Sequence, residues 1–263
     1  MIRIRVMSDL HLELFPGFRI EMPPLLKSDK KRSADEEEED EEILVLAGDI
    51  GDPATDEYRA FLEDCVAKFP RGVFVILGNH EGYGHPSWDD AVRVARSAAT
   101  RAGATLHRDA EFLVPGEVKI AGATLWSRVE GAGASDVRCF IADYRRIGRF
   151  GVADGNAQHD LDVAWIRGEI ALAEAGGYRL VVVTHHAPSL KGTSAPAHDA
   201  SPLNSAFATA LDDLVDRDAV AAWIFGHTHF SSRRGKLVSN QRGYPDSDGA
   251  ASTRFDPLFA ISV

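Results

Sequence analysis

The sequence contains little cysteine, because its 263 residues include only Cys65 and Cys139. Two cysteines exclude a disulfide-based scaffold and a zinc site built mainly from thiolates. We expect both to be reduced thiols in the core, without a redox role.

Long hydrophobic runs are also missing. No apolar stretch approaches the roughly 20 residues that a membrane-spanning helix needs. The first residues, MIRIRVMSD, alternate like a β-strand and lack the apolar core of a signal peptide. We therefore expect a soluble, cytoplasmic protein that has no membrane partner.

Basic residues are outnumbered, with 29 Lys and Arg against 40 Asp and Glu and a net charge of −11. Much of this charge comes from one unbroken run of eight acids, Asp35 to Glu42. A mildly acidic body argues against stable nucleic-acid binding, which depends on neutralising phosphates. A small anionic substrate remains compatible with this charge if metal ions supply the positive charge.

The composition is that of a globular protein, with 44% hydrophobic and 26% charged residues. The length suits one large domain or two small ones, but the chain has no internal repeat and no Pro- or Ser-rich linker. We expect a single domain over residues 1–263. Residues 27–42, a basic cluster followed by the acidic run, are predicted to form a disordered, solvated insertion between the first two strands.

Short apolar runs recur along the chain and predict strands that are buried on both faces. They are Ile2–Met7, Ile43–Ala47, Val73–Leu77, Leu180–Thr184 and Ala222–Phe225. Helix-like stretches run from Asp52-Pro53 towards Phe69 and over Ser87–Ala102, His159–Ala175 and Pro202–Val215. Alternation of strands and helices indicates an α/β fold. Residues 127–155 show only weak periodicity.

Polar residues that can bind metals follow the end of each predicted strand. They are Asp9 and His11, Asp49, Asn79 and His80, His185 and His186, and His227 and His229. The carboxyl ends of parallel strands converge at one sheet edge, where ligands bind. Each segment alone is a weak signal, but five coinciding segments predict one metal site. Nitrogen and oxygen donors without thiolate suit Mn, Fe, Zn, Co or Ni, and the sequence does not choose among them.

Other catalytic motifs are missing from the sequence. It has no G-x-x-x-x-G-K-[ST] phosphate loop and no G-x-S-x-G nucleophile elbow. His80-Glu81 does not continue as H-E-x-x-H, because position 84 is glycine. These absences leave the predicted metal site as the feature of the sequence that indicates chemistry.

The order of the polar segments resembles the calcineurin-like metallophosphoesterases, in particular their small single-domain members. The family pattern D-x-H, G-D, G-N-H-[DE], H, G-H-x-H is complete here as Asp9-Leu10-His11, Gly48-Asp49, Gly78-Asn79-His80-Glu81, His185 and Gly226-His227-Thr228-His229. The resemblance implies a four-layer αββα sandwich, in which two mixed β-sheets are flanked by helices.

The resemblance also implies a centre with two divalent metal ions. Asp9, His11 and His229 would bind one ion, Asn79, His185 and His227 the other, and Asp49 would bridge them. The residues themselves do not distinguish His185 from His186, and only the family position favours His185. Asp52 is similar to a second aspartate of many members, but capping of the following helix explains it equally well.

The implied reaction is attack of a metal-bridging hydroxide on a phosphodiester or phosphomonoester. His80 would protonate the leaving oxygen or stabilise the transition state. Arg145 and Arg242 are candidates for binding the substrate, with ordinary surface ion pairing as the alternative.

We expect a small phosphate ester as substrate, with a slight preference for the diester, and the sequence leaves the oligomeric state open. The alternatives are a phosphoprotein phosphatase and a non-catalytic, metal-stabilised scaffold. The presence of His80 argues against the scaffold, because such proteins tend to lose catalytic positions.

Overall fold

The computed structural model describes residues 2–14, 42–106, 111–114, 116–130, 134–198, 201, 203–244 and 254–263. The predicted insertion at 27–42 lies outside these residues except for Glu42. That residue corrects the predicted boundary, because it is buried and begins a strand, where the guanidinium of Arg5 binds its carboxylate.

The first sheet has five strands in the order β11-β1-β2-β3-β4. Its parallel strands are β1 (Arg3–Met7), β2 (Glu42–Ala47), β3 (Val73–Ile76) and β4 (Thr105–Leu106), and β11 (Ala260–Ser262) pairs antiparallel with β1. Helices α1 (Asp56–Lys68) and α2 (Trp88–Ala102) share a hydrophobic core with one face of this sheet. The sheet is therefore mixed and covered by helices on its outer face.

The second sheet has six strands in the order β5-β6-β7-β8-β10-β9. These are β5 (Glu111–Val114), β6 (Val118–Ala123), β7 (Arg179–Thr184), β8 (Val220–Ile224), β10 (Leu237–Val238) and β9 (Arg233–Arg234). The central four strands are parallel, and β5 and β9 run antiparallel at the edges. Helices α5 (Val152–Gly176) and α6 (Asp212–Val215) cover its outer face.

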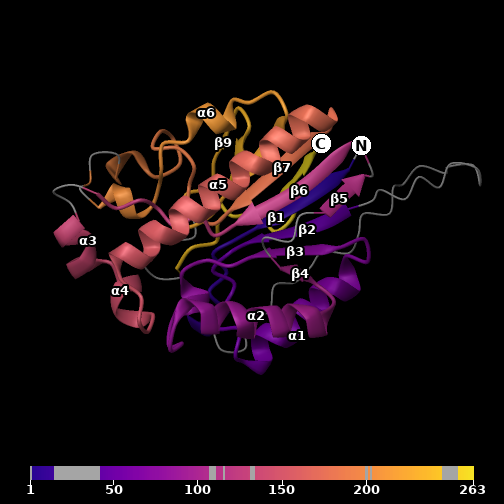
Figure 1. The fold of residues 1–263 in the computed structure, drawn as a ribbon. Helices are drawn as coiled ribbons and strands as arrows, with labels where there is room; N and C mark the ends of the chain where they lie inside the picture. Colours follow the sequence, from indigo (N-terminus) through magenta and orange to yellow (C-terminus); the bar gives the residue numbers. More distant parts are fainter. Residues whose placement is uncertain are drawn as a thin grey trace, which may run out of the picture.

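The two sheets pack face to face through alternate side chains of their strands. Ile4 and Val6 of β1 lie in one buried cluster with Ile120 of β6 and with Val181 and Val183 of β7. Figure 1 shows α1 and α2 on one side of the paired sheets and α5 and α6 on the other. The predicted four-layer sandwich of two mixed sheets is confirmed.

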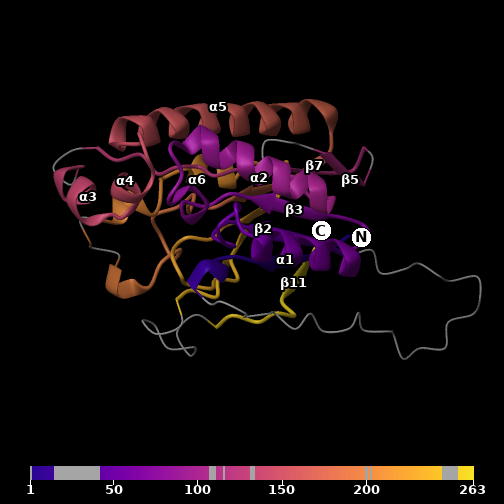
Figure 2. The same ribbon diagram turned by 90° about the horizontal axis from the view of Figure 1, so that it is seen from below.

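One end of the molecule carries the chain termini, and the opposite end carries two short helices. The two termini lie together at one end (Figure 2), because Arg3 of β1 is paired with Ser262 of β11. The short helices α3 (Ala134–Phe140) and α4 (Asp143–Arg146) lie towards the opposite end, where the parallel strands finish. No helix among the described residues is both long and apolar enough to cross a membrane.

Three local predictions were wrong. The helix expected over 202–215 is not continuous: it is a 3-10 turn at Asn204–Ala206 and then α6, because Ala208 forms an isolated bridge with Ala187 between them. Helix α5 begins at Val152, earlier than the expected start at His159, because Asp154 accepts the backbone N–H of Gly151 and caps its first turn. Cys139 is exposed rather than in the core.

Candidate active site

The side chains that follow five strands meet where the carboxyl ends of both sheets converge. Asp9 and His11 follow β1, Asp49 follows β2, and Asn79 and His80 follow β3 in the first sheet; His185 follows β7, and His227 and His229 follow β8 in the second. The site therefore draws on both sheets. The structure brings together every residue that the sequence predicted as a metal ligand.

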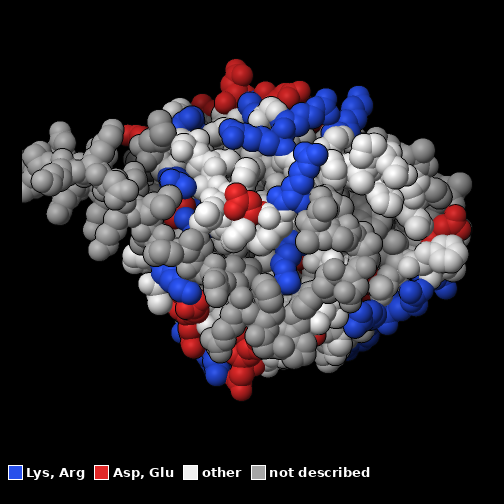
Figure 3. Space-filling view, turned by 180° about the vertical axis from the view of Figure 1, so that it is seen from behind, with Lys and Arg blue, Asp and Glu red and all other residues white. Residues whose placement is uncertain are grey.

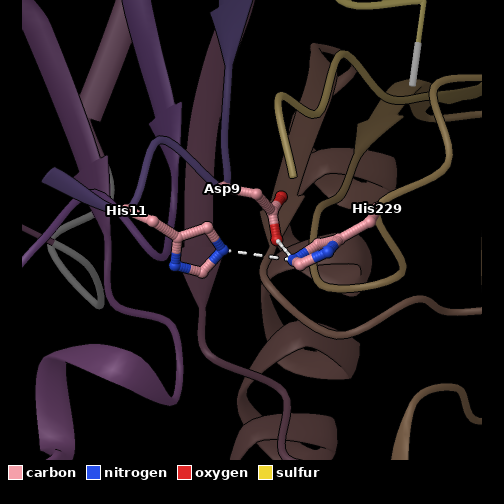
Figure 4. A group of neighbouring side chains, drawn as sticks. All are labelled: Asp9, His11 and His229. Carbon is pink, nitrogen blue, oxygen red and sulfur yellow. Dashed lines mark hydrogen bonds and ion pairs between the residues drawn. The ribbon is translucent and has the colours of Figure 1, made fainter. Parts of the chain in front are cut away.

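The first group of potential ligands consists of Asp9, His11 and His229 (Figure 4). The Nε2 atoms of the two imidazoles lie 3.1 Å apart, and His229 Nε2 lies 3.4 Å from Asp9 Oδ1. Both imidazoles thus direct a nitrogen at the same small space. The Asp9 carboxylate is fully buried and is held in place by the backbone N–H of His227 at 3.0 Å.

The second group consists of Asp49, His185 and His227. His185 Nε2 lies 3.3 Å from Asp49 Oδ1 and 3.0 Å from the side-chain oxygen of Asn79. The other nitrogen of His185, Nδ1, donates to the carbonyl oxygen of Ala47 at 2.9 Å, which leaves Nε2 free to face the group. His186 instead binds Ser127 through Nδ1, so the structure places His185 and not His186 here.

Asp49 lies between the two groups. Its Oδ2 is 3.9 Å from His11 Nε2 and also 3.9 Å from His80 Nε2, whereas its Oδ1 faces His185. His11, Asp49 and His80 accordingly form a third set of converging donor atoms. A carboxylate with one oxygen towards each group has the position that a bridging ligand requires.

His80 is bound on both ring nitrogens by residues that the sequence analysis did not single out as functional. Its Nδ1 donates to Glu13 Oε1 at 2.8 Å, and its Nε2 lies 2.8 Å from the hydroxyl of Tyr244. Glu13 also lies 3.3 Å from His11 Nδ1. Asp52, which is similar to a second aspartate of many family members, accepts the backbone N–H of Ala54 and lies near His85.

The backbone at the site is unusual because five of these residues have positive φ. The angles are 56° for Asp9, 50° for His11, 55° for Asp49, 71° for His227 and 50° for His229. Left-handed backbone is rare outside glycine, and Asp, Asn and His tolerate it better than most residues. Strain of this kind gathers at functional sites, where the surrounding structure holds it.

The pKa values show how strongly the centre attracts positive charge. Burial alone would raise the pKa of Asp49, but the nearby imidazoles of His185 and His80 hold it well below its usual value. Burial likewise acts to lower the pKa of His185, yet Asp49 raises it to about 10. Burial, together with the charge of His185, lowers the pKa of His227 to about 3, so His227 is a neutral imidazole.

His80 and Glu13 form a separate charged pair. Burial opposes the charge on both, but the hydrogen bonds to His11 and His80 lower the pKa of Glu13 to about 2. The pKa of His80 is raised against the effect of burial by Asp49 and Glu13. An imidazolium is therefore favoured at His80, as a proton donor requires.

Two further carboxylates support the centre, and neither was predicted to have a role there. Asp143 is buried and accepts from the Asn79 amide at 2.8 Å and the Tyr83 hydroxyl at 2.5 Å, which turns the Asn79 oxygen towards His185. Glu81 accepts backbone N–H groups of Ile50 and Gly78, each at 2.7 Å, and ties together the loops after β2 and β3. The place of Glu81 in the Gly78-Asn79-His80-Glu81 segment is the sequence signal that could have indicated its supporting role.

The centre opens into a cavity of about 600 Å³. The two arginines predicted to bind substrate are not among the described residues that line it. Arg145 is exposed and donates to the carbonyl of Cys139, and Arg242 donates to the carbonyl of Leu10 at 3.0 Å. Their role in substrate binding stays a prediction.

The net negative charge is not spread evenly over the surface. On the face in Figure 3, Lys and Arg side chains form a band across the upper part, and Asp and Glu lie mostly towards the margins. The edge strand β9 consists of two exposed arginines, Arg233 and Arg234. Charged residues on an edge strand oppose pairing with another sheet.

The donor set fits divalent metal ions. Buried carboxylates beside imidazoles, with no thiolate in any of the three groups, match the ligands of first-row transition metals. A cation would supply the positive charge that Asp49 attracts and would leave His185 neutral, as a ligand must be.

Most of this chain is similar in sequence to a known protein family. Residues 2–231 match the calcineurin-like phosphoesterase family. An uncharacterized protein of Acanthamoeba polyphaga mimivirus is 25% identical over 284 residues, which cover 99% of this chain and 96% of the viral protein. A solved structure described as a candidate 5'-nucleotidase of Staphylococcus aureus, in complex with alpha-ketoglutarate, has a TM-score of 0.49 and 13% identity, and the match covers 91% of this chain. This chain spans about half of that protein, 48%.

The family match covers most of the chain and all the strands that carry the site. The chain therefore belongs to the calcineurin-like phosphoesterase family and is a metal-dependent phosphoric ester hydrolase.

Proposed function

We propose, starting from membership of the calcineurin-like phosphoesterase family, that this chain is a single domain with a dinuclear metal centre that hydrolyses a small phosphodiester. The observation that carries the proposal is the position of the Asp49 carboxylate, which belongs to the donor group of His185 and His227 and also lies 3.9 Å from His11 of the other group. Asp9, His11 and His229 would hold one ion, and His185 and His227 with Asn79 would hold the other. Asp49, whose Oδ1 faces His185 and whose Oδ2 faces His11, would contribute to both sites.

Metal ions at this centre supply positive charge for the phosphoryl oxygens and activate water for attack on phosphorus. The protein's own contribution is to hold the donors before substrate arrives. Asp143 and Tyr83 orient Asn79, and the Ala47 carbonyl orients His185. Such outer partners fix ligand orientation and are usually needed for full affinity.

His80 is the proton donor in this proposal. Its Nε2 faces the cavity beside Asp49 and Tyr244, where the oxygen of a leaving alcohol would need a proton. Glu13 fixes the ring through Nδ1 and favours the protonated form. The Tyr244 hydroxyl keeps Nε2 hydrogen-bonded until a substrate oxygen replaces it.

The diester is favoured over the monoester because of charge. Of the described residues lining the cavity, none is Lys or Arg, and Asp49 and Asp143 are acidic. A diester brings one negative charge where a monoester brings two near neutral pH. Manganese is a suitable ion for the test, because carboxylate is among its preferred ligands.

The test pairs elemental analysis with two assays on the purified protein. Hydrolysis of bis(p-nitrophenyl) phosphate and p-nitrophenyl phosphate is followed with added Mn²⁺ and after chelation. We expect about two metal ions per chain and chelator-sensitive cleavage that prefers the diester.

Each other outcome contradicts a defined part of the proposal. One ion per chain would contradict the dinuclear centre, and preference for the monoester would contradict the substrate class. Full occupancy with no turnover of either ester would favour the scaffold alternative.

A further inference from the structure

The cavity beside the metal centre has an apolar outer half. Among its described lining residues, Phe140 ends α3 and Ile141 comes directly after it, while Leu203 and Phe207 flank the 3-10 turn at Asn204–Ala206. Ile141, Leu203 and Phe207 belong to one hydrophobic cluster. Two separate segments of the chain therefore build one apolar wall.

This wall continues directly into the metal centre. The ring of Phe207 stacks on the imidazole of His227, with centroids 4.9 Å apart and an interplanar angle of 26°. A group bound against Phe207 would thus lie next to a proposed metal ligand. The volume of about 600 Å³ falls in the range of pockets that enclose small organic ligands, about 300–1,000 Å³.

Phe140 is the most exposed large hydrophobic side chain among the described residues, at 68%. A lone exposed phenylalanine is common on protein surfaces, but this one borders the cavity that holds the proposed catalytic centre. An aromatic group placed against it would remove ring surface from water on both partners.

The charge of the lining residues limits which groups can bind in the apolar outer half of the cavity. Asp143 is the acidic residue nearest to the wall in sequence, and no described lining residue is Lys or Arg. The guanidinium of Arg146 lies over the Tyr83 ring, 4.4 Å from its centroid, and Arg145 is held by the Cys139 carbonyl. A second anionic group on the substrate would find no Lys or Arg side chain among the described lining residues.

We propose that the outer half of the cavity is a subsite for an uncharged aromatic ring on the non-leaving side of the phosphodiester. The ring lies between Phe140 and Phe207, and the side chain of Asn204, which also lines the cavity, can bind a polar substituent. This inference rests on the proposed function, because the ring is carried by the ester that the metal centre cleaves.

The test uses two substrates that share p-nitrophenolate as leaving group and carry one negative charge. They are p-nitrophenyl phenylphosphonate and p-nitrophenyl methylphosphonate, which differ only in the ring. We expect kcat/KM for the phenyl compound to exceed that of the methyl compound by about tenfold, which corresponds to about 1.4 kcal/mol and is close to what burial of a large apolar group contributes. Phenylphosphonate should likewise inhibit at lower concentration than methylphosphonate, which gives a binding measurement independent of turnover.

Phe140→Ala supplies the variant. Because Phe140 is exposed, its loss should leave folding intact, and the phenyl-to-methyl ratio should fall at least threefold. Leu172→Ala is the matched control, since Leu172 is 55% exposed on α5 and does not line the cavity. The ratio should not change in this control.

The outcomes separate this inference from the function on which it rests. Hydrolysis of both compounds at equal rates, or a ratio that Phe140→Ala leaves unchanged, would overturn the aromatic subsite while the hydrolase stands. Failure to hydrolyse either compound with metal bound, while phenylphosphonate still binds more tightly, would contradict the proposed diester activity but support the ring subsite.

Discussion

Two buried clusters of charge lie at opposite ends of the strands of the first sheet. At the amino end, the Arg5 guanidinium binds Glu42 through two hydrogen bonds of 2.7 and 3.2 Å, and Arg3 approaches the same carboxylate at 3.1 Å. At the carboxyl end, Asp9 and Asp49 meet several imidazoles and no Lys or Arg among their described partners.

The difference lies in how each carboxylate is neutralised. Glu42 has a permanent cation in the fork geometry that suits a carboxylate, so this cluster needs nothing from outside the chain. Asp49 raises the pKa of a buried histidine to about 10 because it lacks such a partner. The cluster around Glu42 stabilises the fold. The negative charge of the cluster around Asp49 remains able to attract a bound cation. Buried charge alone therefore does not identify a functional site, whereas buried charge without a fixed cation does.

Replacement of Asp49 should have the largest effect. Asp49→Asn keeps the shape but removes the charge shared by both groups, so metal-dependent hydrolysis should fall by at least about 10³-fold. The unfolding free energy of the metal-free protein should change by less than about 3 kcal/mol, the lower end for breaking a buried ion pair. Activity assays, metal analysis and urea denaturation measure these quantities.

Asp52→Asn is the matched control, because Asp52 caps a turn and should be dispensable for turnover. Near-normal activity in Asp49→Asn would remove the distinction between the two clusters.

His80→Ala should separate catalysis from metal binding. We expect kcat to fall by about 10²–10⁴-fold, the usual contribution of a general acid, while the metal content stays as in the parent protein. Steady-state kinetics together with elemental analysis measures both. Loss of one ion would instead make His80 a ligand of the centre. The loss of rate should be smaller for p-nitrophenolate, a good leaving group, than for an alkyl alcohol.

Glu42→Gln should lower the stability of the fold without lowering turnover, which is the reverse of the effects expected at Asp49 and His80. Removing one partner of a buried ion pair leaves Arg5 uncompensated, so the free energy of unfolding should fall by about 3–5 kcal/mol. Turnover per folded, metal-loaded molecule should not change. Denaturant unfolding and active-site titration test the two statements. A variant that loses turnover without losing stability would show that the two ends are coupled.

Glu13→Gln should have the smallest effect of the four. The amide cannot hold the His80 imidazolium as the carboxylate does, so kcat should fall by about 10–100-fold, as for other outer partners of a metal site. Glu13→Asp should recover part of this loss if orientation of His80 is the cause. The ¹⁵N shifts of His80 in NMR spectra, which report its tautomer, should change in Glu13→Gln and not in Asp52→Asn.

The sequence predicted the structure best where the local residue pattern and the arrangement of the strands in the sheet indicate the same position. Strands such as Val73–Ile76 were predicted to within a residue or two, because buried parallel strands are short apolar runs that end in a glycine or polar residue. The donors gathered as expected for the same reason, since parallel strands deliver their ends to one edge.

The residues that the sequence did not indicate act through contacts distant in the chain. Glu13 and Tyr244 meet at His80 across 67 and 164 positions, and no local pattern encodes that meeting. Glu42 was assigned to the acidic run because its neighbours are acidic, although its side chain is buried against Arg5. In each of these cases a contact between residues far apart in the sequence, and not the local sequence pattern, decides where the side chain lies.

The left-handed backbone at Asp9, His11, Asp49, His227 and His229 has a consequence for protein engineering. Swapping donor atoms is a common way to change which metal a centre prefers, for example by introducing cysteine or glutamate. Here each such swap would also force a poorly tolerated side chain into positive φ, where Asp, Asn and His are among the few side chains that fit well. The repertoire of ligands at this centre is therefore restricted by chain conformation before coordination chemistry is considered. Replacing the donor residues at these positions would require rebuilding the loops that carry them.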